Sequence, residues 1–283
     1  KVILADETQL QVLQEENRKN TQKSWMFAFA TEKIRFFQYR ETRSAEFIAE
    51  RLRGYAGVLA SDGYKSYDTL CNDLQIGHSA CWAHTRRKFY DVMKLTKGES
   101  LVGEPRRTIA AQIVEEIRRL YAIEARSREK EYPPEKIRET RQEYSAKIVD
   151  RIFDALKAKQ SAVPQSLPLG EAIRYALGQE AKLRVFLQDG NVPIDTNAVE
   201  NAIRPFVVGR KNWMFSGSPR GADSSALIYS LVETARANDL EPWVYLRYLF
   251  QKLPLCRSDD EIRALMPHRV DRVAVESFDP GVR

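Results

Sequence analysis

Three acidic residues stand at positions where they could act together on a metal ion. Asp6 directly follows the apolar run at residues 2–5, and Asp62 follows the run at residues 57–60 after the single residue Ser61. Both runs are expected to be buried strands, and a carboxylate just beyond a strand's C-terminal end lies at the edge of the sheet, where active sites gather. The third acid, Glu200, is expected in the first turn of a helix. Their types and positions therefore predict a shared site.

Three carboxylates that converge on one point repel one another, and burial adds to that cost. A divalent cation removes the conflict. Mg²⁺ or Mn²⁺ prefers carboxylate oxygen and keeps open positions for water and phosphate. Two such ions a few Å apart can activate a water and stabilise the leaving oxygen of a phosphodiester. The chemistry predicted for the three acids is metal-dependent phosphoryl transfer.

Each acid also has a structural interpretation. Asp6 could start a turn, and Asp62 with Gly63 forms a common turn dipeptide. Glu200 stands three residues after Asn197, which is the spacing of a capping box. The functional interpretation depends on the combination of two strand-end aspartates, a helical glutamate and an all-helical segment before that glutamate.

The elements that must position these acids belong to an α/β fold. Aromatic and β-branched runs predict a hairpin, and the later apolar runs alternate with short helices. Hairpin strands followed by crossovers predict a mixed sheet covered by helices. The expected strands are residues 2–5, 24–30, 34–39, 57–60 and 78–83, with helices over 45–52 and from near Arg86.

The rest of the chain is expected to be helical. Apolar residues at helical steps predict a helical hairpin over residues 105–160, interrupted at Pro133-Pro134. We interpret its dense charges as a solvated surface in preference to a binding face. The remaining expectations are a linker at 162–169, a helix over 171–187, a helix over 195–204 ended or kinked by Pro205, a loop at 216–223 and helices over 225–237 and 242–253.

The motifs around the acids resemble the insertion sequence 66 family of bacterial DDE transposases. The resemblance covers nearly the whole chain and is most distinctive from Glu200 to Thr234. It is carried by Ala5-Asp6-Glu7-Thr8, Ser61-Asp62-Gly63-Tyr64, Cys81-Trp82-Ala83-His84-Thr85-Arg86-Arg87-Lys88-Phe89, Asn197-Ala198-Val199-Glu200-Asn201-Ala202-Ile203-Arg204-Pro205, Gly209-Arg210-Lys211-Asn212-Trp213, Ile228-Tyr229-Ser230-Leu231-Val232-Glu233-Thr234-Ala235 and the tail Asp260-Glu261-Ile262-Arg263-Ala264-Leu265-Met266-Pro267.

This resemblance implies a ribonuclease H-like core with an all-helical insertion before the glutamate-bearing helix. It implies that Asp6, Asp62 and Glu200 bind two Mg²⁺ or Mn²⁺ ions, with Asp6 between the ions. Family members carry N-terminal helix-turn-helix and zinc-binding regions, so we expect this chain to be a catalytic core without them. The expected divisions are a core at 1–95 and 169–253, the insertion at 96–168 and a C-terminal appendage at 254–283.

Cys81 and His84 form a Cys-x-x-His pair, with Cys71 and His78 nearby. Four such residues within a short stretch raise the possibility of a zinc site. His78 and Cys81 would point to opposite faces of a strand, which opposes a shared tetrahedron. Many DDE transposases are similar in having such a pair, and we expect Cys81 and His84 to be structural.

Basic residues are the candidate DNA contacts. The group Arg86-Arg87-Lys88 is expected to open a helix, where positive charge is unfavourable and so favours a phosphate-binding role. Arg204 follows Glu200 by one helical turn and could pair with that acid, bind phosphate or do both. Interleaved basic and aromatic residues suit single-stranded bases, although the aromatic side chains could equally be core. This last group comprises Arg210, Lys211, Trp213, Phe215 and Arg220.

The net charge of the chain is +6, and the excess of positive charge is densest at residues 201–221, which contain four basic residues and no acidic one. We expect this segment to line a DNA path. The apolar fraction of 43% excludes a disordered chain, and the apolar run at 25–30 is too short to span a membrane. The three scattered cysteines indicate a reducing compartment, which is cytoplasmic and nucleoid-associated for a DNA-bound protein.

The sequence therefore predicts a DNA transposase catalytic domain. It would act on transposon ends and target DNA, assemble as a homo-oligomer on DNA and use accessory transposition proteins. One alternative is another ribonuclease H-like nuclease or resolvase. The other is a DNA-binding remnant that no longer catalyses a reaction.

Overall fold

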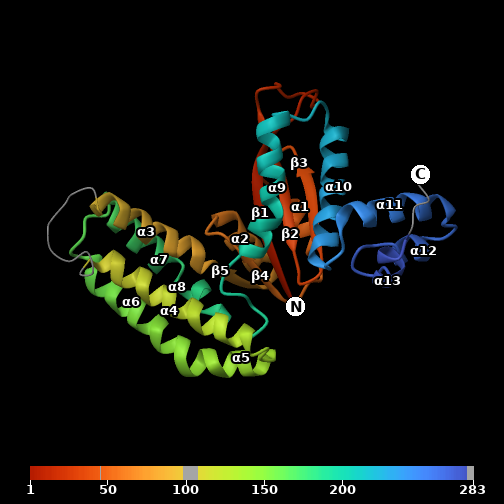
Figure 1. Ribbon diagram of the computed structural model, residues 1–283. Coiled ribbons are helices and arrows are strands. Elements are labelled where there is room, and N and C mark those ends of the chain that lie inside the picture. Colours follow the sequence, from red (N-terminus) through yellow and green to blue (C-terminus); the bar gives the residue numbers. More distant parts are fainter. Residues whose placement is uncertain (45, 98–107, 279–283) are drawn as a thin grey trace. The chain divides into compact units, whose positions relative to one another are not determined.

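The computed structural model describes residues 1–44, 46–97 and 108–278, drawn as ribbons in Figure 1. The chain forms two compact units, each built from separate segments. The first unit comprises Lys1–Val2 and Ala45–Asn197, and the second comprises Ile3–Ser44 and Ala198–Arg283. The predicted boundaries at 1–95, 96–168, 169–253 and 254–283 remain a prediction. In the described ranges, no helix is both long and apolar enough to cross a bilayer.

The second unit contains an antiparallel sheet of β1 (Val2–Gln11), β2 (Lys23–Ala30) and β3 (Arg35–Arg40). The predicted hairpin of β2 and β3 is confirmed, with Ala28 opposite Phe37. One expectation is wrong: Asp6 does not follow a strand but lies inside β1, opposite Ala28. The polar half of β1 stays extended because its backbone pairs with β2, and backbone pairing does not require apolar side chains.

Helix α10 (Pro219–Ala237) covers the outer edge of this sheet and lies alongside β3 (Figure 1). The Ser230 hydroxyl accepts a hydrogen bond from the Phe37 N–H at 2.8 Å. The Thr234 hydroxyl accepts from the Arg35 N–H at 3.0 Å and donates to the Arg35 carbonyl at 2.9 Å. These two hydroxyls, one helical turn apart, satisfy backbone groups that an edge strand would otherwise leave unpaired.

Replacing Thr234 by valine should lower the free energy of unfolding by about 1–3 kcal/mol, because valine keeps the shape but leaves the Arg35 backbone groups without partners. Thr234→Ser is the matched control, since it retains the hydroxyl. Urea denaturation of both variants measures the difference. Equal stability of the valine and serine variants would contradict this role.

The first unit contains β4 (Val58–Ser61) and β5 (Gly77–Ala80), which pair in parallel with Val58 opposite Gly77. The start of β1 also belongs to this unit, because the Val58 N–H donates to the Lys1 carbonyl at 3.2 Å. The strand order is β3-β2-β1-β4-β5. The predicted mixed sheet with flanking helices, of the α/β class, is therefore confirmed.

Helices make up the rest of the first unit. The predicted helical hairpin over 105–160 is confirmed from residue 108 on, since residues 105–107 lie outside the described part of the chain. Its apolar stripes pack into the core around Trp82, Phe153 and Phe186. The helices of the first unit are α1 (Glu46–Arg51), α2 (Lys65–Leu74), α3 (Trp82–Lys97), α4 (Ile109–Glu129), α5 (Pro134–Thr140), π-helix η2 (Arg141–Ser145), α6 (Ala146–Gln160), α7 (Pro168–Gly178), α8 (Glu180–Leu183) and 3₁₀ helix η3 (Val185–Leu187).

Two details of these helices differ from the expectation. Tyr144 stands one helical turn before the buried Ile148, which places it on the apolar stripe, but it is 53% exposed. It lies in η2, whose wider turn shifts the following residues out of the 3.6-residue phase. Helix α3 begins at Trp82 and not near Arg86, so β5 ends earlier than predicted.

The second unit's helices are α9 (Asn197–Trp213), α10, α11 (Pro242–Lys252), 3₁₀ helix η4 (Leu253–Leu255), α12 (Asp259–Ala264) and α13 (Arg272–Glu276). Of the two effects expected of Pro205, an end of α9 is wrong, because the helix continues to Trp213, and a kink remains a prediction. Asn201 is exposed, so solvent can reach the carbonyl for which Pro205 has no N–H. Part of the expected loop is also helix, because Pro219 occupies the first turn of α10, where proline is favourable.

Candidate functional site

Asp62 lies one residue beyond β4, as predicted, and is half-buried. Its Oδ1 accepts a hydrogen bond from the Tyr64 N–H at 3.0 Å, which fixes one face of the carboxylate and turns the chain into α2. The preceding Ser61 is fully buried, and its hydroxyl donates to the Asp62 carbonyl at 3.0 Å. The local chain therefore holds Asp62 at the end of the strand.

A partly buried network of polar side chains begins at Ser61, the residue before Asp62. The Ser61 hydroxyl is 2.8 Å from Nε2 of His78, and Nδ1 of His78 is 3.0 Å from Asp68 Oδ1. Lys182 Nζ reaches the same Asp68 oxygen at 2.6 Å. Burial is the main cause that lowers the pKa of His78, and Lys182 adds to it. Although the order resembles a serine, histidine and aspartate triad, Ser61 is 0% exposed and cannot meet a substrate.

Sequence reasoning missed this network, because β4–β5 pairing brings together residues far apart in the chain. The network also bears on whether Cys71 and His78 could join Cys81 and His84 in a zinc site. Nε2 of His78 is engaged by the Ser61 hydroxyl, and Nδ1 faces the Asp68 carboxylate, so both ring nitrogens lie against groups of the first unit. The Cys71 thiol lies buried on α2, where burial raises its pKa to about 12, so it stays protonated. Neither side chain is suited to a shared zinc site with Cys81 and His84.

Gly63 and Tyr175 form a close contact next to Asp62. A Cβ atom on Gly63 would lie 2.8 Å from Cε2 of Tyr175, so a larger residue would displace the ring. Burial and the Asp62 carboxylate raise the pKa of Tyr175 to about 12. The neutral phenol therefore adds no second negative charge beside Asp62.

Asp6 is half-buried within β1, and its Oδ1 accepts from the Glu7 N–H at 2.9 Å. The neighbouring Glu7 carboxylate accepts from Arg43 Nε at 2.7 Å. Glu7 is thereby neutralised by its own cation, whereas Asp6 lies on the opposite face of the strand because side chains alternate. Of the two adjacent acids, Asp6 remains the predicted metal ligand.

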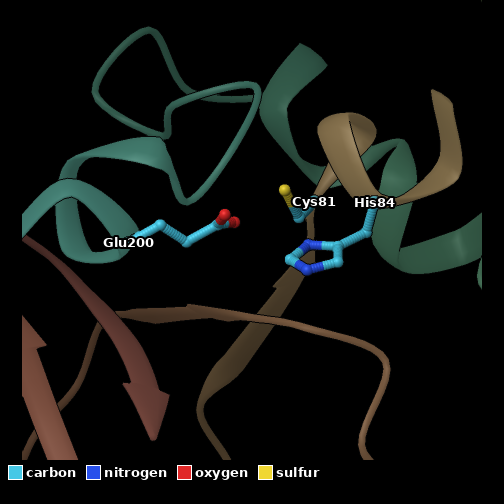
Figure 2. A group of neighbouring side chains, drawn as sticks. All are labelled: Cys81, His84 and Glu200. Atoms are coloured by element: carbon cyan, nitrogen blue, oxygen red, sulfur yellow. The ribbon is translucent and has the colours of Figure 1, made fainter. Parts of the chain in front are cut away.

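Glu200 is a half-buried residue in the first turn of α9, and its side chain extends away from the helix (Figure 2). Asp195, and not Asn197, organises the helix start. Asp195 Oδ1 accepts from the Asn197 N–H at 3.0 Å, and its Oδ2 accepts from the Tyr121 hydroxyl at 2.9 Å. Since Asn197 is already helical, the capping-box interpretation of Glu200 is not supported.

Tyr121 belongs to α4, so α4 is hydrogen-bonded to the segment of the first unit that precedes α9. Burial is the main cause that raises the pKa of Tyr121, and the Asp195 carboxylate adds to it. The phenol therefore stays neutral and donates a hydrogen bond to the Asp195 carboxylate. Sequence reasoning did not connect these two residues, which are far apart in the chain.

Cys81 and His84 lie at the start of α3, with the Cys81 sulfur and a ring nitrogen of His84 within 4.8 Å of one another (Figure 2). The strand position assumed for Cys81 is wrong, because β5 ends at Ala80. The Cys81 thiol accepts from the Thr196 N–H at 3.4 Å, close to the start of α9. This contact supports the predicted structural role, which remains a prediction.

The basic residues after Glu200 fall into two groups. Arg210 and Lys211 line a hollow of about 470 Å³ together with Lys23 and the exposed Met214 and Phe215. Arg210 Nη1 donates to Thr8 Oγ1 at 3.0 Å, which attaches the end of α9 to β1. Phe215 is exposed, so the alternative in which Trp213 and Phe215 are both core residues is wrong for Phe215.

The other residues of this region are placed differently. Trp213 is half-buried and packs edge-on against Phe206, with ring centroids 5.3 Å apart. Arg204 is exposed on α9, and Arg220 is exposed in the first turn of α10. Both arginines can therefore meet a ligand from solvent.

The predicted basic group on α3 divides between two faces. Arg86, Arg87 and Lys88 are exposed, but they lie in the second turn and not at the helix start. The argument from the helix dipole therefore does not apply to them. Arg86 and Arg87 line a hollow between α3 and α4, whereas the Lys88 ammonium lies 5.5 Å from the Tyr175 ring centre.

The three predicted metal ligands belong to both units: Asp62 to the first, Asp6 and Glu200 to the second. Each is half-buried, and each offers hard carboxylate oxygens. Their joint binding of metal ions remains a prediction.

The chain matches two models of known protein families. Residues 1–224 match the family model described as "Transposase IS66 family". The chain belongs to the IS66 transposase family. Residues 230–268 match a second model, the IS66 C-terminal element, which covers the end of α10, α11 and α12.

The chain is also similar to curated proteins of Sinorhizobium fredii. It is 32% identical to "Uncharacterized protein y4qI" over 281 residues, covering 94% of this chain and 50% of that protein. It is 30% identical to "Uncharacterized protein y4jD" over 266 residues, covering 89% of this chain and 50% of that protein. The chain thus spans about half the length of these relatives. No solved structure matches it.

Proposed function

We propose that this chain is the catalytic core of a DNA transposase with a ribonuclease H-like arrangement. In the first reaction, a water oxygen bonds to phosphorus at the transposon end, and the 3′ oxygen leaves as a hydroxyl. In the second, that hydroxyl bonds to a target phosphorus, and the target's own 3′ oxygen leaves. The match to the IS66 family across residues 1–224, with Asp6, Asp62 and Glu200 intact, is the observation that carries this proposal.

The donor set fits hard divalent ions. Asp6, Asp62 and Glu200 supply only carboxylate oxygen, and their half-exposed positions leave room for water and phosphate. These residues would hold two Mg²⁺ or Mn²⁺ ions. When bound, the ions would polarise the phosphate and lower the pKa of the attacking water. The soft Cys71 thiol and the engaged His78 ring do not offer a competing site.

The protein's own groups orient the reacting acids. The Tyr64 N–H holds the Asp62 carboxylate, and the Ser61 hydroxyl, next to His78, holds the Asp62 backbone carbonyl, so the residue is partly ordered before metal binds. Asp195 organises the first turn that carries Glu200. Positioning of this kind lowers the entropic cost of reaching the reactive geometry.

DNA is the proposed partner, both as transposon end and as target. Arg86, Arg87, Lys88, Arg204 and Arg220 are exposed, so phosphates can reach their side chains from solvent. Arg210 and Lys211, next to exposed Phe215, and Trp213 suit an unpaired strand. We further propose assembly as a homo-oligomer on DNA, use of accessory proteins and a cytoplasmic, nucleoid-associated location.

Product analysis distinguishes transposition from its alternatives. With Mg²⁺ or Mn²⁺ and labelled transposon-end DNA, a transposase yields both cut ends and ends covalently joined to a target plasmid. A nuclease or resolvase of the same fold yields cut ends without joined products. A non-catalytic remnant yields neither, and calorimetry would show no ion binding that depends on Asp6, Asp62 and Glu200, even with DNA present.

A further inference from the structure

A hollow of about 640 Å³ lies on the first unit, between α3 and α4. We name it the α3–α4 hollow. Its lining comes from both the core helix that follows β5 and the helical insertion. The lining residues are Ala83, Arg86, Arg87, Tyr90, Asp91, Lys94, Arg118, Tyr121 and Asn197.

The lining carries four cations, Arg86, Arg87, Lys94 and Arg118, against one acid, Asp91. Asp91 already pairs with Lys94 at 3.6 Å, where both side chains are more than half exposed. Arg118 pairs with Glu115 of its own helix at 2.6 Å, again on the surface. Such exposed pairs are weak, so their cations can turn to a phosphate at little cost. The hollow therefore keeps an excess of positive charge.

Tyr90 gives the hollow an aromatic surface. Its side chain is 41% exposed, although it lies between charged neighbours on α3. The Lys94 ammonium lies 4.8 Å and the Arg86 guanidinium 5.8 Å from the ring centre. A ring flanked by cations at this spacing suits a base or sugar stacked on the ring while adjacent phosphates meet the cations.

We propose that the α3–α4 hollow binds one strand of DNA, with phosphates on Arg86, Arg87 and Arg118 and a base or sugar against Tyr90. The proposal rests on the proposed function, since it names a further DNA contact of the same enzyme. It assigns part of the helical insertion to substrate binding, where the sequence had favoured a merely solvated surface. The occupant is a nucleic acid strand and not an acidic peptide, because the hollow combines an exposed ring with several cations.

Arg118→Gln tests the phosphate contact, and Arg119→Gln is its matched control. Arg119 is the next residue of α4, is 52% exposed and pairs with Glu116 at 2.8 Å, but it does not line the hollow. For binding of fluorescent single-stranded DNA to the whole chain, Arg118→Gln should weaken affinity by roughly three- to tenfold at 0.1 M salt. It should also reduce the slope of log affinity against log salt by about 0.7. Arg119→Gln should change neither quantity.

Tyr90 is tested in the same assay. Tyr90→Ala should weaken binding by roughly five- to a hundredfold, because it removes a stacking surface, whereas Tyr90→Phe should stay within about twofold. Equal affinities of the phenylalanine and alanine variants would overturn the stacking contact. Equal salt slopes for Arg118→Gln and Arg119→Gln would overturn the phosphate contact. Circular dichroism of all four variants ensures that folded protein is compared.

Duplex DNA and a poly-glutamate peptide complete the experiment. Tyr90-dependent binding of the peptide in place of single-stranded DNA would overturn the choice of occupant. Duplex binding that depends on Arg118 but not on Tyr90 would overturn the single-strand assignment. The proposed function can fail separately: in that case the wild type gives no metal-dependent cleavage, yet the binding differences among these variants persist.

Discussion

Asp62→Asn is expected to lower metal-dependent cleavage of transposon-end DNA by roughly a thousandfold or more, which corresponds to about 4 kcal/mol of transition-state stabilisation. The amide keeps the size and most hydrogen bonds of the side chain but loses its negative charge. Asparagine can still accept from the Tyr64 N–H, so the turn after β4 should remain folded. Measured activity therefore reports on metal binding and not on the fold.

Asp73→Asn is the matched control. Asp73 is an exposed aspartate on α2 of the same unit, so the substitution removes the same charge from the surface. Its cleavage rate should stay within about twofold of wild type, as expected for a surface change. Both variants should bind DNA as tightly as wild type, or slightly tighter, because removing an acid lessens repulsion of phosphate.

The measurement is the single-turnover cleavage rate across a range of Mn²⁺ and Mg²⁺ concentrations. If the variant recovers at high Mn²⁺, Asp62 contributes mainly to ion affinity. If it stays inactive at every concentration, the acid also sets the geometry of the reaction. Retained cleavage or joining by Asp62→Asn at wild-type rate would disprove the proposed role of the three acids.

Much of the fold could be predicted because its signals are local. The hairpin of β2 and β3 has alternating aromatic residues, and the apolar stripes through Ile117 and Ile152 repeat at the helical period. The errors arise where tertiary contacts override such signals. Helix α9 continues past Pro205 because Ile203 and Phe206, on either side of it, are both buried. The end of β1 is held by pairing with β2, which side-chain polarity does not reveal.

The site shows the same division. Sequence position placed Asp62 correctly, because a strand followed by a turn has a local pattern. The Ser61–His78–Asp68 network and the Tyr121–Asp195 hydrogen bond could not be predicted, since each joins residues from separate elements. One buried ion pair, between Glu124 and Arg141, was missed among the many surface charges of the helical hairpin. Glu124 continues the spacing of Ile117 and Leu120, so this acid on an apolar stripe was a sign of burial.

Arg141→Met should destabilise the first unit more than any surface change. Arg141 is 3% exposed and forms a bidentate salt bridge with Glu124, with Nε–Oε1 at 2.8 Å and Nη2–Oε2 at 2.7 Å. Its Nη1 also donates to the carbonyls of Phe186, Asp189 and Val192, at 2.8–2.9 Å. One side chain thus joins α4, η2 and the segment that leads to α9.

Methionine keeps the side chain's length and apolar contacts but leaves a buried carboxylate and three carbonyls without their donor. Breaking a buried pair from one side costs about 3–5 kcal/mol, and at this chain length the melting temperature should fall by roughly 6–20 °C. The matched control is Lys136→Gln, which breaks the exposed pair of Lys136 with Glu139. That change should cost less than about 1 kcal/mol.

The double variant Arg141→Met with Glu124→Leu separates the two contributions. Removing both charges relieves the unpaired carboxylate, so the double variant should be more stable than Arg141→Met alone. It should remain less stable than wild type, because the carbonyls of the segment at 186–192 still lack a donor. Scanning calorimetry and urea unfolding of the four proteins give these differences. If Arg141→Met has the same melting temperature as the Lys136→Gln control, Arg141 does not stabilise the unit. If the double variant is as stable as wild type, the carbonyl contacts contribute nothing to stability and only the ion pair matters.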